Sequence, residues 1–148
     1  MNLLGIDPGK QGGIALLDAD RSSAFHTVQT WPMPDTTREL HDLIAGLPLI
    51  KLAMLEKPFF PKMIGTRNVA KIAEAYGILK GALAWRDIPF REVTPSEWKK
   101  SLNIPTDKTA ARQRASEFFP DNADQWALKR EDGRAEAALI AWYGMRFR

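Results

Sequence analysis

Short apolar runs separated by turn residues open the chain and predict a β-meander. Residues 3–6 form one such run, which stops at Asp7, and residues 14–17 form a second run after a pair of glycines. Runs of this length bounded by proline and glycine are typical of strands rather than helices. Residues 24–31 are rich in β-forming side chains and predict a third strand. Asp7 therefore stands at the carboxyl end of the first strand.

Beyond residue 35 the pattern becomes one of strands alternating with helices. Residues 52–55 form another apolar run that ends in an acid, Glu56, so the sequence of strand, carboxylate and proline is repeated. Apolar residues spaced by three or four indicate helices, the longest of them over residues 66–85. The remaining predicted elements are helices over 36–46, 94–102, 107–119 and 131–146, a strand over 89–94 and a loop over 121–130.

This order of elements predicts an α/β fold. Three meander strands followed by strand–helix units give a mixed sheet of five strands, antiparallel first and then parallel, with helices on both faces. The chain has 148 residues, which is the size of one ordinary domain and enough to bury a core. We therefore expect residues 1–148 to form a single domain.

The composition argues against several classes of site. There are no cysteines and the only histidines are His26 and His41, so disulfides, a thiolate nucleophile and a zinc site have little support. No apolar stretch is long enough to span a membrane, and Asp7 interrupts the only candidate for a signal peptide. We expect a cytoplasmic protein with no membrane partner and no small-molecule cofactor.

The basic residues are concentrated in the second two-thirds of the chain. Residues 1–50 carry three Lys or Arg against six Asp or Glu, whereas the remainder carries 18 against 12. Such asymmetry fits a polyanionic partner such as nucleic acid, or an ordinary solvated surface. The candidate DNA-binding residues are Lys57, Phe59, Lys62, Arg67, Lys71, Lys99, Lys100, Lys108 and Arg112.

Two further acids, Asp132 and Glu136, open the last predicted helix. Spaced i, i+4, they share one face, and apolar turns follow, so a helix that should be buried begins with two carboxylates. Either the first turn stands in water or a divalent cation neutralises the acids. With Asp7 and Glu56 they make four oxygen ligands of the type that select Mg²⁺ or Mn²⁺. Two such ions about 4 Å apart can activate water and stabilise the leaving oxygen of a phosphodiester.

Five motifs, taken in order, resemble the RuvC-type Holliday junction resolvases of the ribonuclease H-like superfamily. They are GIDPG at 5–9, LEKPF at 55–59, TPSEWKKSL at 94–102, the DK pair at 107–108 and DGRAEAALIA at 132–141. The resemblance spans nearly the whole chain and implies a ribonuclease H-like fold and a homodimer. It also implies a crossover junction endodeoxyribonuclease that resolves four-way DNA junctions by paired symmetric nicks in recombination and repair. Its implied cofactor is Mg²⁺, two ions per active site, with Mn²⁺ as a substitute.

The resemblance further implies roles for single residues. Asp7 matches the family's first-strand acid and Glu56 its fourth-strand acid. The family has two acids at the start of its final helix, often three residues apart, whereas Asp132 and Glu136 are four apart. Glu136 aligns best, and which of the two binds metal directly stays open. Lys108 matches a lysine near the scissile phosphate that helps to orient water or balance charge.

Phe59 resembles the family aromatic that wedges into the centre of the junction. Two phenylalanines beside Lys57 and Lys62 suit stacking on unpaired bases, whereas large aromatics by themselves more often lie in a core. We expect Phe59 to be exposed, and Phe60 and Trp98 to be packed.

Two other functions stay open at this point. One is a related ribonuclease H-like nuclease that cuts other branched or flap DNA, or RNA–DNA hybrids. The other is a non-catalytic protein that binds DNA branches. Cleavage of a panel of DNA and hybrid substrates distinguishes a related nuclease from a resolvase. A metal titration distinguishes a non-catalytic branch-binding protein from a nuclease.

Overall fold

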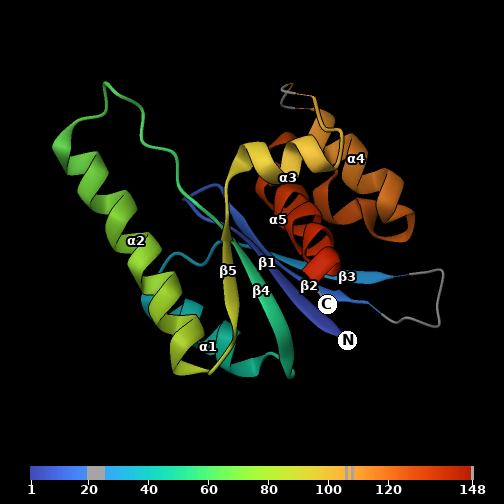
Figure 1. Cartoon of the computed structure of the whole chain (residues 1–148), viewed down its shortest axis with the longest axis horizontal. Helices are drawn as coiled ribbons and strands as arrows, with labels where there is room; N and C mark the ends of the chain where they lie inside the picture. The colour runs from blue at the N-terminus through green and yellow to red at the C-terminus, as the bar shows by residue number, and fades with distance from the viewer. Residues whose placement is uncertain (20–25, 106, 108, 148) are drawn as a thin grey trace.

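Five strands form one mixed sheet in the computed structural model, which describes residues 1–19, 26–105, 107 and 109–147 (Figure 1). The order across the sheet is β3-β2-β1-β4-β5, with β1, β2 and β3 antiparallel and β1, β4 and β5 parallel. The strands are β1 (Asn2–Asp7), β2 (Gly13–Asp18), β3 (Thr27–Pro32), β4 (Ile50–Glu56) and β5 (Phe90–Val93). The predicted fold class is confirmed, and the carboxyl ends of the three parallel strands meet at one edge of the sheet.

Helices cover both faces of the sheet, because alternate strand residues point to opposite sides. Leu4 and Ile6 of β1 pack in one core cluster with α1 and α2, whereas Leu3 packs in another with α3, α4 and α5. Among the described residues, none of the helices has the length and apolar character that a membrane span needs. The helices are α1 (Thr37–Gly46), α2 (Thr66–Trp85), α3 (Pro95–Ser101), α4 (Ala110–Phe118) and α5 (Asp132–Tyr143).

The start of α3 is fixed by a capping box. The Thr94 hydroxyl accepts a hydrogen bond from the backbone N–H of Glu97, and the Glu97 carboxylate accepts one from the Thr94 N–H at 2.7 Å. Each bond satisfies a donor that the helix end would otherwise leave unpaired. Since β5 ends at Val93, the helix turns at once, and Trp98 and Lys99 stand in its second turn at the carboxyl edge of the sheet.

The polar segment predicted as a loop over 121–130 instead forms two 3₁₀ turns, η1 (Pro120–Trp126) and η2 (Lys129–Glu131). The side chain of Gln125 lies along the open edge of β3, where its Oε1 accepts from the Thr30 N–H at 2.7 Å and its Nε2 donates to the Val28 carbonyl at 2.8 Å. These bonds satisfy backbone groups of an edge strand. The pairing is tertiary, so local sequence gave no sign of it.

Two other predicted boundaries shift. The helix predicted over 107–119 begins at Ala110, and Asp107 instead accepts a hydrogen bond from the Thr109 N–H at 3.1 Å. The helix predicted over 131–146 ends at Tyr143 and continues as the 3₁₀ turn η3 (Gly144–Phe147). Residues 24–25 of the predicted third strand lie outside the described residues.

Close packing places α5 directly on β1. A Cβ at Gly5 would collide with the backbone of Ala137 and Ala141, and a Cβ at Gly13 would lie 2.8 Å from the Gly133 carbonyl oxygen. Glycine at these positions lets the helix backbone approach the sheet. The second turn of α5 is thereby held near the carboxyl end of β1, which brings Glu136 toward Asp7.

Candidate active site

Three acidic side chains from three elements meet at the carboxyl edge of the sheet. Asp7 ends β1, Glu56 ends β4, and Glu136 comes from the second turn of α5. Strands β1 and β4 are parallel neighbours in which Ile6 lies opposite Leu55, so the acids that follow stand side by side. The charge of Glu136 acts on both Asp7 and Glu56. The structure therefore brings together three of the four predicted acids, and their roles stay predictions.

Trp98 fixes the carboxylate of Glu56. Its indole Nε1 donates a hydrogen bond of 2.5 Å to Glu56 Oε2, and the tryptophan itself is completely buried. The expectation that Trp98 belongs to the core is confirmed, but its polar atom also orients an acid of the site. The only sign of this contact in the sequence is that the α3 segment directly follows β5. Strand β5 is the neighbour of β4, the strand that ends in Glu56.

Lys99, predicted only as a DNA-binding residue, lies among the three acids. Its Nζ donates to Glu136 Oε1 at 2.7 Å, and its charge lowers the pKa of both Asp7 and Glu56. Both side chains of the pair are partly exposed, at 32% for Lys99 and 23% for Glu136. The ammonium group thus partly balances the negative charge of the cluster from the side of α3.

Two acids of the cluster have raised pKa values. Burial, followed by the charges of Glu136 and Glu56, holds the pKa of Asp7 well above its ordinary range. Burial and the charge of Glu136 raise the pKa of Glu56 to about 7, against the lowering effect of the Trp98 hydrogen bond. Both pKa values stay raised although the charge of Lys99 acts to lower them, so Lys99 only partly offsets the desolvation and repulsion of these carboxyls. Carboxyls with pKa values shifted in this way are typical of functional sites.

Asp132, the fourth predicted acid, faces α4 instead. Its Oδ1 lies 2.6 Å from Nε of Arg112, whose Nη1 also donates to the Ala127 carbonyl at 3.2 Å. Asp132 is not among the charges that shift the pKa of Asp7 or Glu56. The structure therefore places Glu136 with the strand acids and Asp132 with Arg112. The guanidinium of Arg112 already has two partners, Asp132 and the Ala127 carbonyl. A DNA-binding role for Arg112 stays a prediction.

The donor set fits a hard divalent cation by its chemistry. All three acids offer carboxylate oxygens, the ligands that Mg²⁺ and Mn²⁺ prefer, and they carry more negative charge than their surroundings balance. Within the described residues, no three acidic or histidine side chains are close enough to surround one ion. Glu136 is turned to Lys99, so ligation requires its partly exposed carboxylate to rotate toward Asp7 and Glu56.

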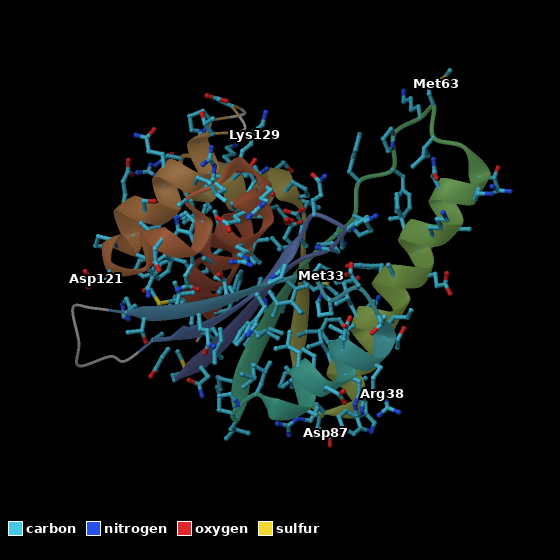
Figure 2. The ribbon with its side chains drawn as sticks, turned by 180° about the vertical axis from the view of Figure 1, so that it is seen from behind. Met33, Arg38, Met63, Asp87, Asp121 and Lys129 are labelled. Carbon is cyan, nitrogen blue, oxygen red and sulfur yellow. The ribbon has the colours of Figure 1, made fainter. Side chains whose placement is uncertain are left out.

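The loop between β4 and α2 presents apolar side chains to solvent. Phe59 is 76% exposed and Met63 is 97% exposed, and Figure 2 shows Met63 at the far tip of this loop. The expected exposure of Phe59 is confirmed, but the expectation that Phe60 is packed is wrong, because Phe60 is 43% exposed. The loop and the first half of α2 project beyond the sheet, so no core is present there to cover it (Figure 1).

The other predicted DNA-binding residues lie on both sides of the acids. The loop and α2 carry one group, and α3 carries the other (Figure 1). Exposed members of the two groups are Lys57, Lys62, Arg67, Lys71 and Lys100. Lys108 lies outside the described residues, so its predicted place near the scissile phosphate is carried by the sequence alone.

The chain is similar in sequence to bacterial proteins over nearly its full length. The crossover junction endodeoxyribonuclease RuvC of Brachyspira hyodysenteriae is 32% identical over 155 residues, which cover 95% of this chain and 91% of that protein. The protein of the same name from Thermotoga petrophila is 30% identical over 154 residues, which cover 96% of this chain and 90% of that protein. No protein-family model matches the chain.

Solved structures with the same fold include Holliday junction resolvases. The Thermus thermophilus RuvC structure has a TM-score of 0.66 and 16% identity, and the match covers 99% of this chain and 96% of that one. The same protein in complex with a Holliday junction substrate gives a TM-score of 0.65. The fowlpox virus Holliday junction resolvase gives 0.60 at 16% identity and covers 100% of both chains. At this identity the likeness shows the fold, which is ribonuclease H-like.

Proposed function

Because the chain belongs to the RuvC family of crossover junction endodeoxyribonucleases, we propose that it resolves four-way DNA junctions by paired, symmetric nicks. The observation that carries this proposal is the meeting of Asp7, Glu56 and Glu136 at the carboxyl edge of the sheet. The family implies dependence on a divalent metal, and we propose two Mg²⁺ ions per site, with Mn²⁺ as a substitute. Four-way junctions form during DNA recombination and repair. We therefore propose that the protein acts where the DNA is, in the cytoplasm of a bacterium or of a phage-infected cell.

Each residue of the site then has a part in phosphodiester hydrolysis. Asp7, Glu56 and Glu136 would hold the metal, which when bound would supply an activated water and charge stabilisation for the leaving oxygen. Trp98 keeps the Glu56 carboxylate in one orientation, since its indole holds Oε2. Lys99 Nζ donates to Glu136 and balances part of its charge. On the resemblance alone, Lys108 would act near the scissile phosphate, where it helps to orient water or balance charge.

The metal-free protein should lose stability as the pH rises toward neutrality. The pKa of Glu56 is about 7 in the folded chain against an ordinary 4.5, so between these values the folded state keeps a proton that the unfolded chain releases. The contribution is therefore fully present below about pH 4.5 and lost by about pH 7, and it amounts to roughly 3 kcal/mol. Urea unfolding in EDTA from pH 5 to pH 8 measures it.

The matched control is Glu56→Gln, whose amide does not titrate. The difference in unfolding free energy between the two proteins should change with pH, because groups remote from Glu56 titrate equally in both. Mg²⁺ should stabilise the wild type at pH 8 more than at pH 5, since the ligands must be deprotonated. Parallel pH profiles for the two proteins would show that Glu56 does not titrate in this range.

Phe59→Ala should weaken junction cleavage about tenfold or more and leave the fold intact. Stacking of a base on an aromatic side chain is worth about 1–3 kcal/mol, and loss of an exposed side chain changes stability by only about 0.5 kcal/mol. Phe59 is 76% exposed. Cleavage rates and thermal melts of Phe59→Ala and Phe60→Ala test this, with the smaller loss of activity expected for Phe60. A melting temperature lowered by many degrees would identify Phe59 as a packing residue.

A homodimer is part of the proposal, because a four-way junction has two-fold symmetry and paired nicks need two sites. One face of α2 supports a dimer, because it is made of small residues that are exposed in the single chain. Nothing lies within 4 Å of a Cβ built at Gly77 or Gly81. Glycine inside a helix costs about 1 kcal/mol relative to alanine, and the chain's own packing does not require it here. The exposed small residues of this face are Ala70, Ala73, Gly77, Gly81 and Ala84.

Gly77→Arg should convert the dimer to a monomer and reduce junction cleavage at least about tenfold. A long side chain would hold two helices apart where small residues allow contact, while the fold of one chain has room for it. Light scattering and circular dichroism report the mass and the helix content. Gly46→Arg, at the exposed and equally open end of α1, is the matched control and should stay dimeric. A dimeric, fully active Gly77→Arg protein would remove α2 from the interface.

A cleavage panel tests the proposed function as a whole. Four-way, three-way and flap DNA and an RNA–DNA hybrid of related sequence are incubated with the purified chain, with and without Mg²⁺. The four-way junction should be cut by symmetric nicks at least about tenfold faster than the others, and only with metal. Preferred cutting of flaps or hybrids would support the other nuclease function. Tight junction binding without cutting in any metal would support the non-catalytic one.

A further inference from the structure

A cavity of about 640 Å³ opens beside the acids, on the face of the sheet that α1 and α2 cover. Its lining comes from the β1–β2 turn, the segment that leads from β3 into α1, the inner face of α2, and Glu56, Pro58 and Phe59. Figure 2 shows Met33, one of its wall residues, at the end of the sheet that faces α2. Glu56 also lines it, so the cavity adjoins the candidate active site directly.

The walls combine apolar and aromatic surface with two cations, Lys10 and Lys71, and two acids, Asp35 and Glu56. Ile72 and Leu79 of α2 and Leu40 of α1 supply apolar surface, and the ring of Phe59 lines the cavity while staying 76% exposed. Lys71 and Lys10 lie on its exposed rim. This arrangement suits a flat group with apolar faces that is joined to a phosphate.

Tyr76 presents a fixed ring to the same cavity. Its hydroxyl donates to Glu92 Oε1 at 2.7 Å, and Lys80 donates to the same oxygen at 3.0 Å. The aromatic wall is thus held by bonds that lie outside the cavity. A fixed ring loses little freedom when another ring packs against it, so it favours binding of a planar ligand.

We propose that this cavity takes an unpaired nucleotide of the DNA junction, next to the phosphodiester that is cut. The proposal rests on the proposed function and adds a subsite to it. The base would lie against the aromatic and apolar walls, and its phosphate would meet Lys10 or Lys71. Extracting a base costs least where it has already lost a stacking neighbour, as at the exchange point of a junction.

A side chain from a second copy of the chain is the other candidate occupant, and the geometry of α2 disfavours it. Ile72, Tyr76 and Leu79 line the cavity, whereas Gly77 and Gly81 lie on a different face of the same helix. A partner that packs on the glycine face does not enter the cavity. The space stays open to DNA from the side of the acids.

The test measures coupling between the cavity and a single base. Ala75→Trp places a large ring into the cavity from an exposed position on α2, and Ala45→Trp makes the same change on the exposed surface of α1, away from the cavity. Junction affinities are measured in EDTA for intact four-way junctions and for junctions with an abasic nucleotide at each position next to the exchange point. Thermal melts confirm that each variant is folded. Ala75→Leu repeats the test with a smaller side chain.

At one position, base removal should weaken binding by the wild type and by Ala45→Trp about tenfold, and by Ala75→Trp less than about twofold. Equal changes in all three proteins at every position, including no change, would overturn the subsite. Binding of free deoxynucleoside monophosphate without any effect on junction affinity would overturn it as well. A wild type that does not distinguish four-way from linear DNA would contradict the proposed function itself, which the intact junctions reveal separately.

Discussion

Replacing Asp7 by asparagine, or Glu56 by glutamine, should reduce junction cleavage by at least about a thousandfold and leave junction binding within a few-fold of wild type. A neutral amide is a poor ligand for a hard cation, and metal stabilisation of a reacting phosphodiester is worth several kcal/mol. Binding should persist, because it depends on Lys and Arg contacts to phosphates and on the aromatic loop. Single-turnover cleavage with Mg²⁺ and junction affinity in EDTA separate the two effects.

The same substitutions should leave the metal-free fold as stable as wild type or more so. Glu56 is buried and Asp7 is half-buried, and desolvation and like charges raise the pKa of both, so their ionised forms oppose folding near neutral pH. Glutamine at position 56 keeps an oxygen that can accept the indole N–H of Trp98. Asp124→Asn, an exposed acid of η1, is the matched control and should cut normally. Ordinary cleavage by either active-site variant would defeat the assignment.

The strand acids could be predicted from sequence because their placement follows from local pattern plus one topological rule. Asp7 and Glu56 each end a short apolar run, and parallel strands bring their carboxyl ends to the same edge. The chain order predicted a meander followed by parallel strands, and the structure places β1 and β4 as parallel neighbours. What local pattern could not supply was the set of side chains that surround these acids.

Three features escaped because tertiary contacts decide them. Trp98 has the apolar character of a core residue, and only its place beside β4 gives its indole the Glu56 carboxylate as a partner. Lys99 has the character of a surface cation, and only the docking of α3 brings it to Glu136. Phe60 has the character of a buried residue, but the loop extends past the core that would bury it. In each case the sequence revealed the residue type but not the surroundings that decide what the side chain does.

The choice between Asp132 and Glu136 depends on how α5 sits on the sheet. Residues spaced i, i+4 share a helix face, so the sequence pattern could not separate them. The structure separates them by position along the helix, because Gly133 packs against the β1–β2 turn and leaves Asp132 outside that contact. One turn further, Glu136 lies where the sheet ends in Asp7 and Glu56.

Glu136→Gln should therefore reduce cleavage by about a thousandfold, and Asp132→Asn should reduce it much less, by about tenfold or below. The charge of Glu136 acts on Asp7 and Glu56. Asp132 instead forms a partly exposed ion pair with Arg112, so its effect on cleavage comes only from helping to hold α4 in place. Loss of such a pair costs at most about 1 kcal/mol of stability. Cleavage rates across a Mg²⁺ titration distinguish the two, because loss of a ligand weakens the response to metal. Full activity of Glu136→Gln would move the metal-binding role to Asp132.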